Sequence, residues 1–426
     1  MIDIRLLRDE KTRKLVKKSE RDRFKDDSIV DKLYLMDQKR IKLKFKIEQF
    51  NREINKNQKE INQAIKSNKG KVDAKEIISQ LEKVDLKKDK GELEKELKEL
   101  ESEINILLVS IGNVLSDKVP VCKTEDGNLT VKTFKKEGCV VKKHSFVKLM
   151  EQYTNAVAGS LVLGHRGYFL QGKMAQLALA LKTYALTFLS ERGYIHIQTP
   201  VMMKREVMKN TAQLSDFDDQ LYKVDGGYYL IATSEQPLSA LHMNQHMQPT
   251  ELPKCYAGES LCFRKEAGAY GKDNAGLFRV HQFEKIEQFV ICNPDESDEY
   301  LEKMIKTAEE FLASLDIPYR IVCIASGEMN DSASLKYDIE AWFPESQKYR
   351  ELVSASNCTD YQSRSMSVYY GNVKNKTERP VFVHMLNATL CAVQRSLCCI
   401  VENYQNDDGT ITVPNVLRKF LNFDKF

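Results

Sequence analysis

The segment from Phe263 to Glu287 gathers residue types that can bind a charged ligand. It reads FRKEAGAYGKDNAGLFRVHQFEKIE, in which two alternating runs flank a glycine-rich stretch. This pattern predicts an antiparallel β-hairpin. On a buried strand face, charged groups need a ligand or each other, whereas a strand facing solvent would carry them without any function. Because side chains alternate across a strand, one face of the second run would present Arg279, His281, Phe283, Lys285 and Glu287.

Three shorter segments carry further polar residues. They are Thr233-Ser234-Glu235, ELVSASNCTDYQSR from Glu351 to Arg364, and LNATLCAVQR from Leu386 to Arg395. Taken singly, such side chains are more often ordinary surface contacts than parts of a site. The sequence has neither a G-x-G-x-x-G after a predicted strand nor a G-x-x-x-x-G-K-[ST], so it favours neither a Rossmann dinucleotide site nor a P-loop. Its ten Cys include no C-x-x-C pair, which argues against structural zinc.

The elements that must position these residues follow from hydrophobic periodicity. An amphipathic helix is predicted from Met174 to Leu189, and a second from Leu390 to Glu402. Short strands bounded by turn residues are predicted at Tyr228–Ala232, Leu277–Glu287, Gln288–Cys292, Tyr319–Ile324 and Tyr337–Phe343. Clustered strands followed by helices are typical of an α+β domain, with an antiparallel sheet flanked by helices.

The composition divides the chain into two parts. A length of 426 residues suggests two or three domains. The net charge of +4 is uninformative by itself, but residues 1–118 carry 30 Lys and Arg against 24 Asp and Glu and contain neither Pro nor Cys. No stretch is apolar enough to span a membrane, and the N-terminus has no secretory signal. With its scattered thiols, the chain is expected to be a soluble cytoplasmic protein.

The basic part has the pattern of a helical hairpin. One coiled-coil seam runs along Leu33, Met36, Leu43, Ile47, Phe50, Ile54, Ile61 and Ala64. A second runs along Leu93, Leu97, Leu100, Ile104, Leu107 and Ile111. Turn-forming residues at Ser67–Gly70 would join two antiparallel helices, with an irregularity near Gly91.

Two functions suit such a hairpin. It is either a dimerisation rod or an arm that binds a phosphate backbone by its shape and charge. The second reading rests on the basic excess, which is densest at Lys39, Arg40, Lys42, Lys44 and Lys46.

The motifs resemble those of one enzyme family. The pattern F-R-x-E-A-G-x-x-G-x-D-x-x-G-L-x-R-V-H-Q-F-x-K-x-E in 263–287 closely resembles the second signature motif of seryl-tRNA synthetases, which are class II aminoacyl-tRNA synthetases. The 233–235 segment is similar to the T-x-E motif of that family, and 351–364 to its E-x-x-S-x-S-N-x-x-D-[FY]-Q-x-R segment. The 386–395 segment is similar to its third motif, and Pro200 matches the first, which builds the family's dimer interface.

The resemblance covers essentially the whole chain and looks most like the eukaryotic cytosolic branch. It implies an N-terminal tRNA-binding domain at 1–118, with the coiled-coil arm, and a class II catalytic domain at 119–426. The implied activity is activation of serine with ATP to seryl-adenylate, followed by transfer to the 3′ end of tRNA(Ser). The implied partners are serine, tRNA(Ser) and a second copy of the chain.

The resemblance also implies roles for single residues in binding ATP. The permanently charged guanidinium groups of Arg264 and Arg395 would bind the α- and γ-phosphates. Phe283 would stack on adenine, and Glu266 would read its amino group. Further phosphate contact would come from Arg279, while Mg²⁺ would be held by Glu351 and Ser354, whose oxygen ligands suit that cation.

For serine, the resemblance implies that Glu287 and Glu235 bind the ammonium group. Thr389 would bind the hydroxyl group, and Thr233 would contribute backbone and hydroxyl contacts. One departure is Ser365, which stands where a second basic residue is usual after Arg364. Two other functions remain to be distinguished: an enzyme that loads an amino acid onto a protein carrier, which would not need the basic arm, and a silent tRNA-binding scaffold, which would lack a catalytic residue.

Overall fold

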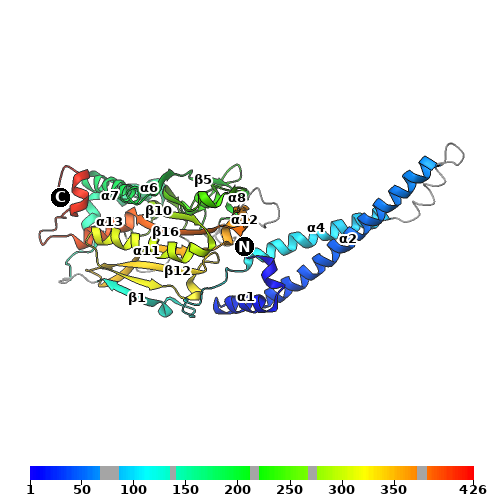
Figure 1. Ribbon diagram of the computed structural model, residues 1–426. Coiled ribbons are helices and arrows are strands. Elements are labelled where there is room, and N and C mark those ends of the chain that lie inside the picture. The colour runs from blue at the N-terminus through cyan, green and yellow to red at the C-terminus, as the bar shows by residue number, and fades with distance from the viewer. Residues whose placement is uncertain (68–85, 135–140, 212–219, 267–275, 372–380) are drawn as a thin grey trace. The chain divides into compact units, whose positions relative to one another are not determined.

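The computed structural model describes residues 1–67, 86–134, 141–211, 220–266, 276–371 and 381–426 (Figure 1). Its contacts divide the chain into two compact units. The smaller unit comprises residues 3–21 and 25–111. The larger comprises residues 1–2, 22–24 and 112–426. Within the described residues, every helix is too short or too polar to cross a membrane.

The smaller unit is helical. A 3₁₀ turn, η1 (Ile4–Leu7), and helix α1 (Glu10–Asp22) precede the two long helices α2 (Ser28–Ser67) and α4 (Leu86–Ser110), which pack against each other. This pairing confirms the predicted helical hairpin, although its turn at 67–70 lies mostly outside the described residues. The buried seam residues are Leu33, Leu43 and Ile47 on α2 and Leu100, Ile104, Leu108 and Ile111 on α4.

Two details of the predicted seams are wrong. Leu108 is buried between Ile104 and Ile111, whereas Leu107 is only half-buried, so the buried face of α4 passes through Leu108. Gly91 causes no break, since α4 continues through it as a helix.

The larger unit is built on an eight-stranded sheet in the order β1-β11-β12-β13-β16-β10-β9-β4. All neighbours are antiparallel except β4 and β9, which are parallel. This arrangement confirms the predicted α+β class. The bounds are β1 (Leu129–Phe134), β4 (Ile195–Gln198), β9 (Lys254–Phe263), β10 (Gln282–Cys292), β11 (Tyr319–Cys323), β12 (Leu335–Phe343), β13 (Lys348–Asn357) and β16 (His384–Ala392).

Helices cover one face of this sheet. Residues of α7 (Gly172–Ser190), α11 (Ser297–Ser314) and α13 (Val393–Asn403) share one apolar core with the sheet, and Figure 1 shows these helices alongside the strands. Ile286 of β10 is fully buried in this core. Because side chains alternate along a strand, its neighbours Lys285 and Glu287 point to the opposite face.

The predicted hairpin around the glycine-rich segment is confirmed by the antiparallel pairing of β9 with β10, in which Phe263 lies opposite Gln282. The predicted strand from Leu277 begins only at Gln282, because 277–281 form turns and irregular structure. The last helix likewise begins at Val393 and not at Leu390, which belongs to β16.

Candidate active site

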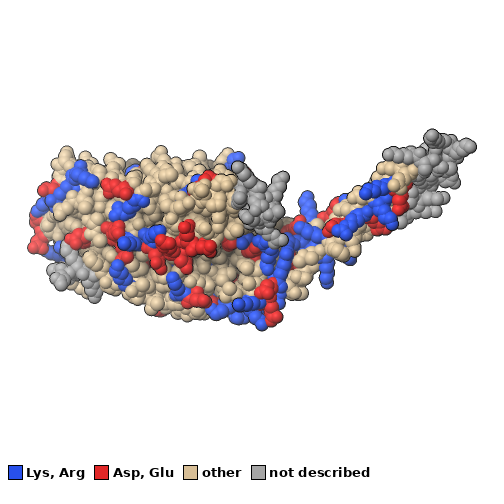
Figure 2. Space-filling model, viewed as in Figure 1, with Lys and Arg blue, Asp and Glu red and all other residues tan. Residues whose placement is uncertain are grey.

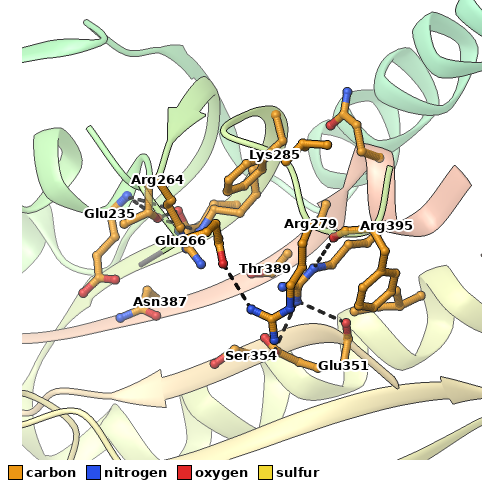
Figure 3. Close-up of a pocket in the computed structure, with 18 of the residues that line it drawn as sticks. Glu235, Arg264, Glu266, Arg279, Lys285, Glu351, Ser354, Asn387, Thr389 and Arg395 are labelled. Atoms are coloured by element: carbon orange, nitrogen blue, oxygen red, sulfur yellow. Dashed lines mark hydrogen bonds and ion pairs between the residues drawn. The ribbon is translucent and has the colours of Figure 1, made fainter. Parts of the chain in front are cut away.

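A cavity of about 330 Å³ lies on the sheet face opposite the helices (Figure 3). It is bordered by strands β10, β12, β13 and β16, by the start of α13 and by Arg264 just after the end of β9. The cavity brings together every residue that the sequence predicted to bind ATP or serine: Thr233, Glu235, Arg264, Glu266, Arg279, Phe283, Glu287, Glu351, Ser354, Thr389 and Arg395.

A β-bulge places Glu351 in the cavity. Glu351 and Ser354 are three positions apart, which on a regular strand would point them to opposite faces. The register of β12 against β13 shifts after Ile339, so that Leu352 has no partner across the strand pair. The extra residue turns Glu351 to the face of Ser354, and both side chains line the cavity.

A second bulge, at Leu390, ends the regular ladder that places the residues predicted to bind serine opposite each other. On β16, Leu390 is skipped in the pairing with β10: Cys391 lies opposite Ile286, and Thr389 lies opposite Glu287. Directly opposed side chains on antiparallel strands are close neighbours. The hydroxyl of Thr389 and the carboxylate of Glu287 therefore share one end of the cavity.

Glu287 is the centre of a buried hydrogen-bond cluster. Its Oε2 accepts from Thr233 Oγ1 at 2.6 Å, from Ser234 Oγ at 2.7 Å and from the backbone N–H of Glu235 at 3.0 Å. Its Oε1 accepts from Lys285 Nζ at 2.8 Å. Burial raises the pKa of the Glu287 carboxyl, but Lys285 and the hydroxyl donors outweigh burial and hold the pKa below its ordinary value.

Glu235 titrates differently, although it lies beside this cluster. Burial, together with the nearby charge of Glu287, raises the pKa of Glu235 to about 7, against the hydrogen bond that Gln362 donates to its Oε1 at 2.6 Å. Two carboxyl groups at one end of the cavity thus have their pKa values shifted in opposite directions, which is a common feature of functional sites.

Arg279 and Arg395 occupy the other end of the cavity. Arg279 Nη1 lies 3.1 Å from Glu266 Oε2, and Arg395 Nη1 lies 3.4 Å from Glu351 Oε2 (Figure 3). Burial raises the pKa of Glu351, but Arg395, followed by Lys336 and Arg264, keeps it below its ordinary value. The carboxylate is therefore charged at neutral pH and available to a cation.

The residues present fit Mg²⁺ only together with a nucleotide. Glu351 and Ser354 provide hard oxygen ligands, whereas no cluster of three or more His, Cys, Asp or Glu able to hold a metal occurs in the described part of the chain. Mg²⁺ typically binds through one or two carboxylates and takes its other ligands from phosphates and water.

The residues that line the cavity differ in part from those that the sequence predicted. His281 was expected beside Phe283 but does not line the cavity, because it precedes the strand and its Nδ1 lies 3.0 Å from the carbonyl oxygen of Arg264. Lys285 and Lys336 line the cavity, yet neither was among the predicted site residues. The alternation that placed Lys285 on the face of Phe283 and Glu287 was the signal that could have identified it.

The basic run on α2 is only partly available to a partner. Lys39 Nζ pairs with Glu96 and Lys44 Nζ with Glu101, each at 2.7 Å, and Arg40 Nη2 lies 2.5 Å from the buried Asp37. Lys42 and Lys46 are exposed, and Figure 2 shows basic side chains along this arm. Among the described residues, no ion pair engages these two lysines.

The fold and site together define a class. Residues 220–404 match the family model of the tRNA synthetase class II core domain (G, H, P, S and T), so the larger unit contains a class II aminoacyl-tRNA synthetase core. Residues 1–115 match the model of the seryl-tRNA synthetase N-terminal domain. The chain belongs to the seryl-tRNA synthetase family.

Proteins similar to this chain match it over its full length. A serine–tRNA ligase of Encephalitozoon cuniculi (strain GB-M1) is 54% identical, with 100% of this chain and 99% of the relative covered. A cytoplasmic serine–tRNA ligase of Arabidopsis thaliana is 45% identical, with 100% and 96% covered. The crystal structure of seryl-tRNA synthetase from Pyrococcus horikoshii complexed with ATP is 36% identical, has a TM-score of 0.91, and is matched over 100% of this chain and 99% of that one.

The Glu287 cluster leads to a prediction about stability. Lys285→Met retains the length of the side chain but leaves the buried Glu287 carboxylate without its cation. Breaking such a buried pair costs about 3–5 kcal/mol, so we expect the free energy of unfolding in urea to fall by that amount. Lys303→Met, which removes an exposed pair with Glu299, is the control and should leave the transition unchanged. Equal urea midpoints for the two variants would contradict the role of Lys285.

Proposed function

We propose that this chain is a serine–tRNA ligase, which activates serine with ATP to seryl-adenylate and transfers serine to the 3′ end of tRNA(Ser). The observation that supports this most directly is the single cavity that holds arginines at one end and the Glu287–Thr389 pair at the other. A phosphate-binding region and an amino-acid-binding region are thereby joined in one space.

The first step joins two anions, so the site must neutralise charge. A serine carboxylate oxygen attacks the α-phosphorus of ATP, and the bond to pyrophosphate breaks. Arg264 binds the α-phosphate, Arg395 the γ-phosphate, and Arg279 adds a further phosphate contact. Glu351 and Ser354 would hold Mg²⁺, which would supply further neutralisation of the phosphate charge.

Base recognition uses the end of the hairpin. The Arg264 guanidinium carbon lies 5.3 Å from the centre of the Phe283 ring, so one aromatic face and one planar cation border the same part of the cavity. Adenine stacks on Phe283, and the Glu266 carboxylate, held by Arg279, accepts from the adenine amino group.

Serine is recognised at the other end. Its ammonium is bound by Glu287 and Glu235, with Thr233 beside them, and its hydroxyl by Thr389. A site built to hydrogen-bond a hydroxyl strongly rejects an analogue that lacks one, because its polar groups are then left unpaired. The second step follows in the same cavity: a ribose hydroxyl of tRNA(Ser) attacks the acyl carbon, and AMP leaves.

Serine-dependent exchange of pyrophosphate into ATP tests the proposal. Purified protein should show exchange that needs serine, and Arg264→Ala should abolish it, because the α-phosphate then loses its guanidinium. Lys209→Ala, an exposed lysine outside the cavity, is the control and should exchange normally. Absence of exchange above background with the unaltered protein would refute the proposed activity.

The arm is proposed to bind tRNA(Ser) through phosphates. Lys39 and Lys44 are held by glutamates of α4, and Arg40 by Asp37, so in this proposal Lys42 and Lys46 carry most of the electrostatic contact.

The double variant Lys42→Gln/Lys46→Gln should therefore charge tRNA(Ser) less efficiently and with a shallower salt dependence, while serine-dependent exchange stays intact. Lys14→Gln/Lys32→Gln, which removes two exposed lysines from α1 and the start of α2, is the control. Equal loss of charging and exchange from the Lys42/Lys46 variant would overturn this division of roles.

The active form is proposed to be a cytoplasmic homodimer. Helix α6 (Ala156–Leu163) exposes Val157 by 77%, Leu161 by 85% and Val162 by 75%, and Ile195 on the edge strand β4 is 58% exposed. Exposed apolar side chains gathered on one helix, as on α6, are typical of a protein interface. The buried free cysteines suit a reducing compartment, and the Arabidopsis relative is named cytoplasmic.

Sedimentation equilibrium should therefore find a dimer, and Leu161→Glu should shift it to monomer, since burying a charge in an apolar interface is unfavourable. Lys173→Glu, an exposed charge change on α7, is the control. A monomer for the unaltered chain at micromolar concentration would contradict the proposal.

A further inference from the structure

The floor of the cavity contains a charged pair that the proposed mechanism does not use. Lys336 and Asp338 lie on β12, and their partners across the sheet on β13 are Ser356 and Ser354. Lys336, Ser354 and Ser356 line the cavity, whereas Asp338 lies beneath them and is only 7% exposed. A charged side chain so deeply buried needs partners that compensate for its lost hydration.

The Asp338 carboxylate is incompletely satisfied. Its Oδ2 lies 3.6 Å from Lys336 Nζ, which is an ion pair longer than a good hydrogen bond. Its Oδ1 is buried and has no hydrogen-bond partner in the described part of the chain. Leaving a buried acceptor unpaired is costly, so the arrangement points to a partner that arrives with the ligand or turns towards Asp338 when the ligand binds.

Ser354 is the nearest candidate for that partner. As the residue directly opposite Asp338, it projects from the same face of the sheet. A serine hydroxyl has one hydrogen to donate and two lone pairs to offer. If the hydrogen is donated to Asp338, the lone pairs point into the cavity, which is the orientation that a cation ligand requires.

We propose that Asp338 is a positioning residue of the nucleotide site, whose carboxylate accepts the Ser354 hydroxyl hydrogen and holds the Lys336 ammonium. Ser354 then presents lone pairs to Mg²⁺, and Lys336 directs its charge to the ATP phosphates. This inference rests on the proposed function. Hydrogen-bond partners behind a metal ligand commonly contribute 10–100-fold to metal affinity.

Metal binding tests the inference without relying on catalysis. Mn²⁺ is titrated into the full chain with a non-hydrolysable ATP analogue, and bound Mn²⁺ is followed by electron paramagnetic resonance. Asp338→Asn replaces the charged carboxylate, which would accept the Ser354 hydroxyl hydrogen and pair with the Lys336 ammonium, by a neutral amide. This variant should bind Mn²⁺ about 10-fold more weakly. Glu340→Gln, two residues along β12 and paired with Arg320 outside the cavity, should bind as the unaltered protein does. Unchanged Mn²⁺ affinity in Asp338→Asn would overturn the inference.

A double-mutant cycle separates positioning from general stabilisation. If Asp338 acts through Ser354, then adding Asp338→Asn to Ser354→Ala should weaken Mn²⁺ binding little further; fully additive losses would refute the link.

If Asp338→Asn does not fold, Lys336→Gln provides the test: it should weaken binding of the ATP analogue and leave the dissociation constant for serine unchanged. An unchanged affinity for the analogue would overturn the role of Lys336. Because these are binding measurements, their failure leaves serine-dependent exchange by the unaltered protein as a separate result.

Discussion

The buried carboxylate of Glu287 is the interaction on which the rest of the site depends. It receives hydrogen bonds from Thr233, Ser234 and Glu235, which lie more than fifty positions earlier in the sequence. Lys285, two residues earlier on the same strand, neutralises its charge. A charge taken out of water is tolerated only when it is paired and hydrogen-bonded, so the site depends on these donors as well as on the carboxylate itself. The end of the cavity that contains Glu287 is thereby shaped before any ligand arrives.

Two irregularities of the sheet extend this constraint to the rest of the cavity. The bulge at Leu352 turns Glu351 to the face of Ser354, and the bulge at Leu390 turns Ala392 to the face of Thr389, so that all four line the cavity. Regular strands would bury one member of each set against the helices on the other face. The bulges disrupt the ladder locally and gather acidic, basic and hydroxyl groups in one cavity.

Charged side chains are compensated by neighbours of opposite charge within each of the two units. In the cavity, arginines and lysines keep Glu351 and Glu287 ionised, whereas burial and the nearby charge of Glu287 raise the pKa of Glu235. In the arm, glutamates of α4 hold two of the basic side chains that the sequence offers to RNA. The basic excess of residues 1–118 therefore overstates the charge that a phosphate backbone would meet.

The sequence by itself determined the motif residues, the helical hairpin and the antiparallel pairing around 263–287, because these follow from residue type and local periodicity. The tertiary structure decided which side chains share a face. The spacing of Glu351 and Ser354 predicts opposite faces until a bulge intervenes, His281 leaves the face of Phe283 because the strand starts after it, and Leu108 replaces Leu107 in the seam of α4. These outcomes depend on packing against distant segments, and on a strand a one-residue change in register reverses the direction of a side chain without altering any local pattern.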